Sequence, residues 1–234
     1  MARKPTRRTA PRPRRHPARG GYARGERTRL RIIETAIEMF GSLGYERTAT
    51  RAIARRARVS LPALTYYFGG KEGLHLACAE YIMADLRERL DPATERVSEA
   101  LRNPRLPRAA LLELLAQVLD PFLESMATER PESWVLFFTR AQIERTAAFD
   151  VLFERVAGTI LKLSAAIVAR ILGRSAEDPE TLIRALTIVG QIALVRRGRP
   201  MLLRTLGWSS FGDQHLEVLK RALWKQILSG LREA

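Results

Sequence analysis

The chain has 234 residues, of which 46% are hydrophobic, so it is long enough to bury one large core or two modest ones. Its single cysteine, Cys78, excludes an intrachain disulfide, and its formal net charge of +15 favours a polyanionic partner. No apolar run reaches the roughly 18 residues that a membrane-spanning helix needs, and no apolar segment follows the basic start as in a secretory signal, so we expect a cytoplasmic protein without a membrane partner.

The positive charge is concentrated at the N-terminal end of the chain. Residues 1–24 carry nine Lys or Arg and no acidic residue, and residues 25–74 carry nine basic and five acidic residues. Residues 75–234 are nearly balanced, with twenty-two basic and twenty acidic residues. This distribution indicates that a polyanion binds at the N-terminal end.

Residues 1–24 are rich in Arg, Pro, Gly and Ala, and we predict that they are a disordered basic arm. Such a segment cannot bury enough apolar surface to offset the entropy lost on ordering. One interpretation is an arm that contacts phosphates or a DNA minor groove. The alternatives are a solvated tail or a wrongly assigned start codon.

From residue 25 onward the pattern is helical. Apolar residues at spacings of three and four predict a first helix, which we expect Gly41 and Gly44 to end. Thr48 and Thr50 are N-cap candidates for a short second helix over residues 51–57. Ser60 is the expected N-cap of a third helix, which ends at the two glycines 69 and 70, and a fourth helix is expected over residues 71–90.

The second and third predicted helices are separated only by residues 58–60, which is the spacing of a helix-turn-helix. A small apolar cluster between the two helices fixes the angle between them. It is formed by Ile53, Ala54, Ala57, Val59 and Leu64. Thr65, Tyr66 and Tyr67 are then free to face a major groove. Lys71 begins the next helix, where a cation and backbone N–H groups together suit a phosphate. The alternative is that these aromatic residues are ordinary core residues, which we expect only for Phe68.

The remaining segments also have helical periodicity. We predict helices over residues 107–127, 131–145, 149–173, 179–203 and 213–231, with a bend near residues 198–200. We expect Cys78 to be a small buried hydrophobic residue. No segment alternates with the period of two that a strand requires, so the predicted fold class is all-α.

The stretch from Gly25 to Leu74 resembles the DNA-binding domain of the TetR family of bacterial transcriptional regulators. The matching positions are Phe40-Gly41, Gly44-Tyr45, Thr48-Ala49-Thr50, Ile53-Ala54, Val59-Ser60, Leu64 to Phe68 and Lys71 to Leu74. The resemblance implies a homodimer that binds a pseudo-palindromic DNA operator, usually as a repressor released by a small-molecule effector. The family's DNA contacts then fall on Thr50, Arg51, Leu61, Pro62, Ala63, Thr65, Tyr66, Tyr67 and Lys71.

The sequence departs from the family pattern at two positions. Arg58 occupies the turn position that usually holds Gly, where the left-handed conformation costs a residue with a Cβ atom about 1–2 kcal/mol. Thr65 stands where the family usually has Tyr, so we expect the base preference at that point to differ.

The C-terminal part resembles the TetR branch with a CerR-type C-terminal domain, on the stretches FFTRAQIERTAAFDVLFERV and IVGQIALVRRGRPMLLRTLGWSSF. The resemblance implies that residues 75–234 form an effector-binding and dimerisation domain. Because such a pocket is mostly apolar with a few polar anchors, we expect a hydrophobic effector held by residues among Phe122, Met126, Trp134, Phe137, Phe138, Arg140, Gln142 and Gln191. Core packing or a surface position is the alternative for each of them.

The last two long predicted helices are the expected dimer interface, because the family pairs these helices across a two-fold axis. The last one carries a wide apolar face formed by Leu216, Leu219, Leu223, Trp224 and Ile227. The alternative is that this face packs within one subunit.

An enzyme is the first rival class. The sequence contains no nucleophile elbow, phosphate-binding loop or metal-spaced Cys and His cluster, so we expect no catalytic site, metal or cofactor. A DNA-organising or division-control protein on the same fold is the second rival, and activation of transcription remains an alternative to repression.

Overall fold

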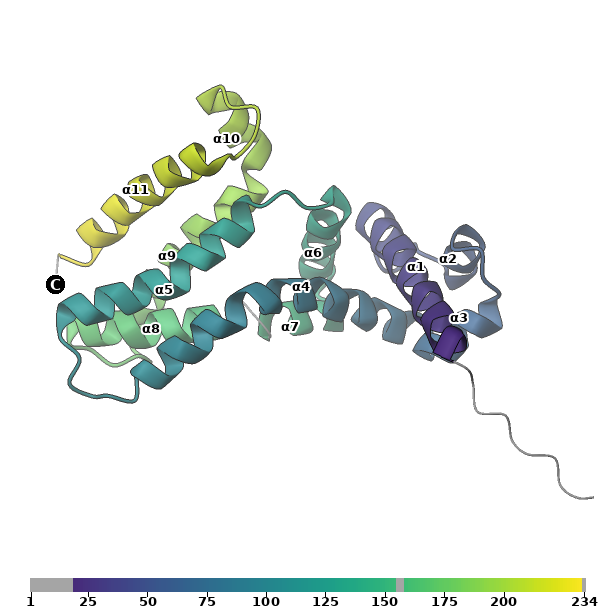
Figure 1. The fold of residues 1–234 in the computed structure, drawn as a ribbon, viewed down its shortest axis with the longest axis horizontal. Helices are drawn as coiled ribbons and strands as arrows, with labels where there is room; N and C mark the ends of the chain where they lie inside the picture. Colours follow the sequence, from purple (N-terminus) through teal and green to yellow (C-terminus); the bar gives the residue numbers. More distant parts are fainter. Residues whose placement is uncertain (1–18, 155–157, 233–234) are drawn as a thin grey trace, which may run out of the picture.

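The computed structural model describes residues 19–154 and 158–232, and these residues form α-helices and no β-strand (Figure 1). The predicted all-α fold class is therefore confirmed. In chain order the helices are α1 (Arg19–Leu43), α2 (Thr50–Arg56), α3 (Leu61–Phe68), α4 (Lys71–Ala100), α5 (Arg108–Ala127), α6 (Glu132–Glu144), α7 (Ala147–Leu152), α8 (Gly158–Leu172), α9 (Pro179–Arg197), α10 (Arg199–Leu206) and α11 (Asp213–Gly230). None of the described helices is long and apolar enough to cross a membrane.

The molecule is elongated, and its two ends are formed by different parts of the chain (Figure 1). Helices α1, α2 and α3 lie at one end, and α5, α8, α9 and α11 lie at the other. Helix α4 runs from the first end toward the second, and α6 packs against α1. Two helices, α4 and α6, therefore connect the end that carries the helix-turn-helix with the rest of the molecule.

The boundaries of α1 differ from the prediction. The helix begins at Arg19, so residues 19–24, which we assigned to the disordered arm, are helical; residues 1–18 lie outside the described residues. Gly41 lies inside the helix and does not end it. Gly44 follows the last helical residue with a φ of +86°, a conformation that glycine adopts without strain.

Helix α4 does not end at residue 90 as predicted but continues through Asp91 and Pro92 to Ala100. Proline removes one backbone hydrogen bond inside a helix. In this helix, Ala93, Thr94 and Val97 are buried directly after the proline, so packing of the second half outweighs the local signal to stop.

Two of the other predicted helices are divided in the structure. The segment predicted as one helix over residues 149–173 contains α7 and α8, with residues 155–157 outside the described residues. The bend predicted near residues 198–200 is confirmed, since Gly198 separates α9 from α10.

One hydrophobic core runs through both ends of the molecule. In the N-terminal part it contains Ile33, Phe40 and Leu64, all with at most 1% of their surface exposed. The prediction for Cys78 is confirmed: the side chain is fully buried, and its thiol donates to the carbonyl oxygen of Ile33 at 3.7 Å.

Candidate nucleic-acid interface

The start of α2 is fixed by α1 and not by a side-chain cap. Ala49 is the N-cap residue and makes no side-chain cap hydrogen bond, so the prediction that Thr48 or Thr50 caps this helix is wrong. Thr48 is fully buried, and its hydroxyl donates to the carbonyl oxygen of Gly44 at 2.7 Å and lies 3.2 Å from that of Met39. It therefore satisfies free carbonyl groups at the C-terminal end of α1.

The turn between α2 and α3 has the left-handed residue that its sequence position requires. Arg58 adopts a φ of +53°, and the amide of Val59 donates to the carbonyl oxygen of Ala54 at 2.9 Å. From α1, the guanidinium of Arg31 donates to the carbonyl oxygen of Ala57 at 2.9 Å. This contact between α1 and the end of α2 was not predicted from the sequence, because Arg31 looks like any other exposed charge on an amphipathic helix.

Helix α3 follows the local signals in its sequence. The hydroxyl of Ser60 accepts a hydrogen bond from the amide of Ala63 at 3.2 Å, which confirms Ser60 as the N-cap. Leu64 is fully buried, while Tyr66 is 85% exposed. Gly69 ends the helix in the left-handed conformation, with a φ of +73°. One side of α3 is thus anchored in the core, and the opposite side is free.

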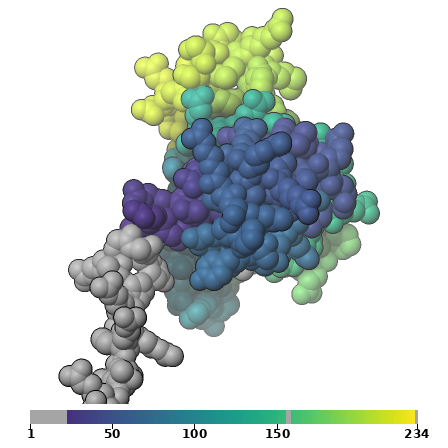
Figure 2. Space-filling view, turned by 90° about the vertical axis from the view of Figure 1, so that its right-hand side faces the viewer, coloured from purple at the N-terminus to yellow at the C-terminus, as the bar shows by residue number. Residues whose placement is uncertain are grey.

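The nine predicted DNA-contact residues all come from α2, α3 and the first residue of α4, at the end of the molecule that faces the viewer in Figure 2. Four of them are exposed: Arg51, Pro62, Thr65 and Tyr66. The other five are half-buried: Thr50, Leu61, Ala63, Tyr67 and Lys71. Phe68 is also half-buried and packs against the core, as we predicted.

Further cations flank these residues. Arg47, Arg55 and Arg58 are exposed, and Arg55 and Arg58 form no salt bridge with any described residue. Arg56, by contrast, is paired with Glu38 of α1 at 2.6 Å. Unpaired guanidinium groups beside an exposed helix suit the phosphates of a duplex.

Lys71 connects the start of α4 to the loop between α1 and α2. Its ammonium group donates to the carbonyl oxygen of Glu46 at 3.1 Å and lies 4.4 Å from the centre of the Tyr45 ring. An ammonium group has three N–H donors, so the two contacts leave capacity for a phosphate.

The same loop is held from its other side by α6. The amide of Tyr45 donates to the carboxylate of Glu144 at 2.7 Å. At Gly41, α1 and α6 approach closely. A Cβ atom at Gly41 would lie 2.9 Å from the carbonyl oxygen of Ser133. The sequence did not predict this junction, since its two halves lie about a hundred residues apart.

His75 is buried at this junction among aromatic rings. Its ring centroid lies 4.7 Å from those of Phe40 and Tyr45 and 4.8 Å from that of Phe137. Burial, assisted by the nearby charge of Lys71, lowers the pKa of His75 to about 4. The imidazole is therefore neutral at physiological pH and acts as a packing residue between the two parts of the chain.

The eight residues predicted to bind an effector do not share one environment. Phe122 and Phe137 are buried in the core, and Gln142 is exposed and accepts a hydrogen bond from Arg197. The remaining five are half-buried: Met126, Trp134, Phe138, Arg140 and Gln191. Trp134 lies 5.8 Å from Tyr81 of α4, measured between ring centroids.

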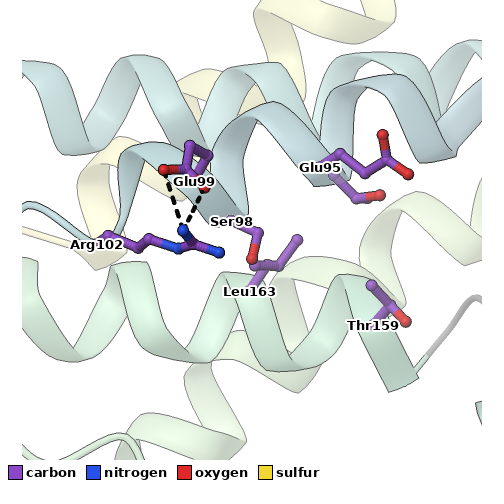
Figure 3. Close-up of a pocket in the computed structure, with 7 residues that line it drawn as sticks. Glu95, Ser98, Glu99, Arg102, Thr159 and Leu163 are labelled. Atoms are coloured by element: carbon purple, nitrogen blue, oxygen red, sulfur yellow. Dashed lines mark hydrogen bonds and ion pairs between the residues drawn. The ribbon is translucent and has the colours of Figure 1, made fainter.

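A surface hollow of about 420 Å³ lies between α4 and α8, away from these residues (Figure 3). It is lined by Thr94, Glu95, Ser98, Glu99, Arg102, Thr159 and Leu163. Arg102 pairs with Glu99 at 3.0 Å, so the charged groups of the hollow neutralise each other in part. Its polar lining does not suit the hydrophobic effector that we expected. The described residues contain no cluster of His, Cys, Asp or Glu that can hold a metal ion.

The apolar face predicted on α11 packs within the same chain. Leu219 and Ile227 are buried, and the indole N–H of Trp224 donates to Asp120 of α5 at 2.8 Å. Helix α9 instead exposes the apolar side chains of Leu182, Ile183, Leu186 and Leu194. The exposed apolar surface of this region is therefore mainly on α9.

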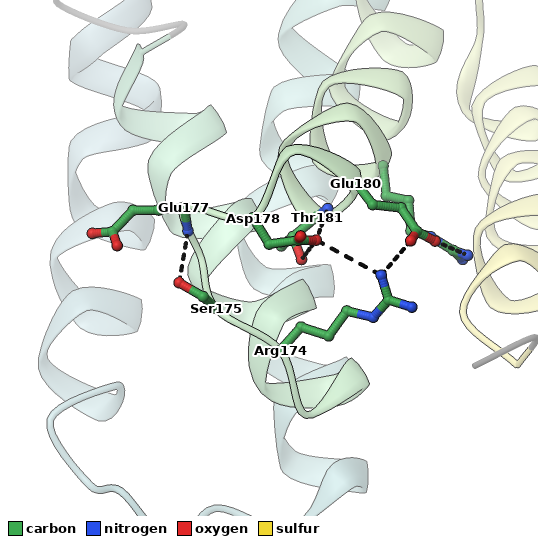
Figure 4. Close-up of polar contacts among 7 residues, drawn as sticks. Arg174, Ser175, Glu177, Asp178, Glu180 and Thr181 are labelled. Atoms are coloured by element: carbon green, nitrogen blue, oxygen red, sulfur yellow. Dashed lines mark hydrogen bonds and ion pairs between the residues drawn. The ribbon is translucent and has the colours of Figure 1, made fainter.

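The start of α9 is held in place by polar contacts at the turn after α8 (Figure 4). Asp178 caps the helix by accepting from the amide of Thr181 at 3.0 Å. Arg174 pairs with Asp178 at 3.7 Å and also with Glu180, while Arg184 pairs with Glu180 at 2.8 Å. These contacts anchor the first turn of α9 to the turn after α8.

Comparison with known families identifies matches to both parts of the chain. Residues 32–78 match the family described as bacterial regulatory proteins of the tetR family. Residues 111–233 match the C-terminal domain of the HTH-type transcriptional dual regulator CecR, which is the correct name for the branch that we described as CerR-type. This second match alone covers more than half of the chain.

Individual proteins agree with these matches. The chain is 29% identical over 213 residues to the HTH-type transcriptional dual regulator CecR of Shigella flexneri, covering 90% of this chain and 95% of that protein. It is 44% identical over 57 residues to the regulatory protein RaaS of Mycobacterium tuberculosis, covering 24% of this chain and 26% of that one. A crystal structure of a TetR-like regulator from Rhodococcus sp. RHA1 superposes with a TM-score of 0.53 at 21% identity, covering 86% of this chain and 96% of that chain.

Proposed function

The chain belongs to the TetR family of transcriptional regulators, in the branch with a CecR-type C-terminal domain, and we propose that it acts as a homodimeric repressor that a small-molecule effector releases from a pseudo-palindromic operator. Members of this family are DNA-binding regulators and not enzymes. Repression, dimerisation and effector release are the parts that we propose. We also propose that the protein acts in the bacterial cytoplasm, on the nucleoid when it is bound to DNA.

The observation that carries the DNA-binding part is the free side of α3. Ser60 and Leu64 fix the helix on the core, and Thr65 and Tyr66 project from it into solvent. A helix of this kind enters a major groove, where hydroxyl groups and aromatic edges meet base edges and thymine methyl groups. Arg55 and Arg58 lie to the side, where phosphates of the same duplex would pass.

The exposed apolar side of α9 supports the homodimer. Leu182, Leu186 and Leu194 are spaced by four and eight residues and share one side of the helix, together with Gly190. A second copy covers this surface through a two-fold axis, which matches the symmetry of a palindromic operator. The two α3 helices then enter major grooves about 34–36 Å apart on one face of the duplex.

Effector release requires that a ligand bound in the C-terminal part changes the position of the helix-turn-helix. Two helices can transmit this change, since α4 carries Lys71 at its start and α6 carries Glu144 at its end, and both residues contact the loop at residues 44–46. A shift of either helix changes the separation of the two recognition helices in the dimer. Simultaneous binding to both half-sites, and the avidity that it provides, is then lost.

The name of the Shigella relative, a dual regulator, favours a second candidate function. A protein of this kind activates transcription at some promoters and represses it at others. The same DNA-binding surface serves both outcomes, and the position of the operator relative to the promoter decides between them.

The experiment that tests the proposal is selection of bound sequences from a random DNA library by the purified protein. The full chain is compared with a form that lacks residues 1–18, because removal of these residues leaves α1 whole. We expect a two-fold symmetric consensus from both forms. The full chain should show the steeper dependence of affinity on salt, since the arm adds phosphate contacts without base readout.

Two other outcomes would contradict the proposal. Binding that yields no consensus and disappears at moderate salt would indicate a non-specific DNA-organising protein. A consensus without two-fold symmetry would contradict the homodimer. The selected operator is then placed at different positions relative to a promoter that drives a reporter gene. A decrease in reporter expression indicates repression, and an increase indicates activation.

A further inference from the structure

Several arginine side chains meet where α5 ends, α6 begins and α9 passes into α10. Arg196 donates to the carbonyl oxygen of Thr128 at 2.7 Å, and Arg199 donates to that of Ala127 at 2.7 Å. Arg130, from the loop between α5 and α6, pairs with Asp85 of α4. These three arginines are defined here as the arginine cluster.

The arginine cluster has more positive charge than its acidic neighbours balance. Asp85 pairs with Arg130 and also lies 3.8 Å from Arg89. Among the described residues, Arg196 and Arg199 form no salt bridge with a carboxylate. Burial is the main cause that lowers the pKa of Arg196 to about 10, and the charges of Arg130 and Arg199 lower it further. The negative charge of Glu129 raises the pKa of Arg196, against the effect of burial and of the neighbouring arginines.

Arg130 contains an unpartnered donor in this cluster. Its side chain is only 11% exposed, and its Nη2 atom is buried without a hydrogen-bond partner in the described part of the chain. A buried donor without a partner costs about 1–3 kcal/mol, and a bound ion is one of the usual reasons for it. Repulsion between cations and a free buried donor both favour an anion at this position.

We propose that the arginine cluster binds the oxyanion group of a small-molecule effector whose planar apolar body lies against Trp134 and Tyr81. This inference rests on the proposed function, of which it specifies the effector class. A carboxylate or a phosphate accepts hydrogen bonds from several guanidinium groups at once, and such charge-assisted bonds are stronger than neutral ones.

The aromatic neighbours of the arginine cluster supply the apolar part of the site. The guanidinium of Arg130 lies 5.6 Å from the centre of the Trp134 ring, and that ring lies 5.8 Å from the ring of Tyr81. Both aromatic rings are half-buried, so each retains some surface that an additional planar group can cover. A charged head beside aromatic surface selects an amphipathic ligand over a purely hydrophobic one.

The site touches both helices that connect the two ends of the molecule. Asp85 and Tyr81 belong to α4, whose first residue is Lys71, and Trp134 belongs to α6, whose last residue is Glu144. An anion on the free Nη2 atom of Arg130 binds the guanidinium that also pairs with Asp85 through Nη1, so the two negative charges repel each other. The contact between α4 and the start of α6 is therefore weakened when the anion binds, which gives the ligand a differential effect on the two states.

The alternative is that the arginines only stabilise the C-terminal end of α5, whose last carbonyl groups they hold. Arg170 is a matched control for this role, because it donates to the carbonyl oxygen of Leu101 at 3.2 Å and to that of Asn103, just after α4. Replacing an arginine that only caps a helix should lower the stability of the free protein. Replacing an arginine in a crowded cluster should cost less stability, because the relief of repulsion offsets the lost hydrogen bond.

The experiment is isothermal titration calorimetry at low ionic strength, where charge interactions are least screened. The probes are 2-naphthoate, phenyl phosphate, inorganic phosphate and the neutral 2-naphthalenemethanol, added to the full-length protein without DNA. We expect 2-naphthoate or phenyl phosphate to bind at least about tenfold more tightly than the neutral compound, and the order of the two identifies the preferred oxyanion. Arg196→Gln should weaken this binding by about tenfold or more, and Arg170→Gln should leave it within about twofold.

Thermal unfolding of the free proteins separates the two roles. Arg196→Gln should lower the unfolding midpoint less than Arg170→Gln does, because the relief of repulsion offsets the lost hydrogen bond to Thr128. Arg199→Gln is the second variant if the first does not fold. The inference is overturned if none of the three anions binds the wild type, if the neutral compound binds as tightly as both 2-naphthoate and phenyl phosphate, or if neither variant weakens binding. Because these measurements contain no DNA, such a failure is distinct from failure of the operator selection, which tests the proposed function.

Discussion

Arg58 is the residue at which the sequence departs most clearly from the usual chemistry of the turn. Its φ of +53° is the left-handed conformation, and its side chain is exposed beside α3. Arg58→Gly should raise the free energy of unfolding by about 0.5–1 kcal/mol, because relief of the left-handed strain is offset in part by the greater conformational freedom that glycine gives the unfolded chain. The variant should also bind its operator more weakly and with a salt slope reduced by about one, since a phosphate contact is lost.

Arg145 provides the control for this prediction. It follows α6 with a φ of +50° and is not among the predicted DNA-contact residues. Arg145→Gly should give a similar gain in stability on denaturant unfolding with unchanged operator affinity. A loss of stability in Arg58→Gly, or equal effects of the two variants on DNA binding, would contradict the assignment.

His75 makes the stability of the molecule depend on pH. Its pKa is about 4 in the folded chain and near 6.5 when unfolded, so the unfolded state binds the proton first as the pH falls. Stability is therefore lost between these two values and is unaffected by this group above them. Between pH 7 and pH 5 the loss should be about 2 kcal/mol. Urea unfolding of the wild type and of His75→Gln at both pH values measures this loss. The difference in the free energy of unfolding between the two proteins should be smaller at pH 5 by this amount. A difference that does not change with pH would refute the prediction.

At the scale of the helices, the junction of α1 and α6 depends on Gly41. A Cβ atom there would lie 2.9 Å from the carbonyl oxygen of Ser133 and 3.1 Å from the amide nitrogen of Phe137, and both are backbone atoms that cannot rotate away. Gly41→Ala should therefore destabilise the protein by about 1–3 kcal/mol, although the same change in an open helix is stabilising. Gly25→Ala in the same helix is the matched control, because its nearest neighbour is the hydroxyl of Tyr67 at 3.6 Å. Chemical denaturation compares the two, and a stabilised Gly41→Ala would show that the helices are not in close contact.

The helix-turn-helix was predictable because its signals are local. Ser60, Leu64 and Gly69 are close in sequence, and each acts on its immediate neighbours. The end of α4 was predicted wrongly at Asp91-Pro92, because a local stop signal cannot report the burial of Val97 by other helices. The contact of Glu144 with Tyr45 joins residues 99 positions apart, and neither residue type indicates a partner. The arginine cluster was missed for the same reason, since Arg130 precedes Arg196 and Arg199 by more than sixty residues and each of them resembles a surface charge alone.

At the scale of the whole molecule, the proposed dimer depends on the apolar side of α9. Ile183 on this helix is 62% exposed, and Ile143 near the end of α6 is 68% exposed, so the two are matched in residue type and exposure. If a second copy covers α9, Ile183→Glu places an unpaired charge in an apolar interface and should dissociate the dimer. Ile143→Glu, outside that interface, should remain a dimer. Sedimentation equilibrium at micromolar concentration distinguishes these outcomes.

The same pair of variants connects assembly to DNA binding. A monomer engages one half-site at a time, so Ile183→Glu should lose at least about a hundredfold in operator affinity because two-site avidity disappears. The affinity of this variant for a single half-site should be unchanged, since α3 and α9 lie at opposite ends of the molecule (Figure 1). Equal operator affinities for Ile183→Glu and Ile143→Glu, or a wild-type protein that sediments as a monomer, would place the dimer contact elsewhere. In that case the exposed side of α9 would bind a different partner, and the palindromic symmetry of the operator would require another origin.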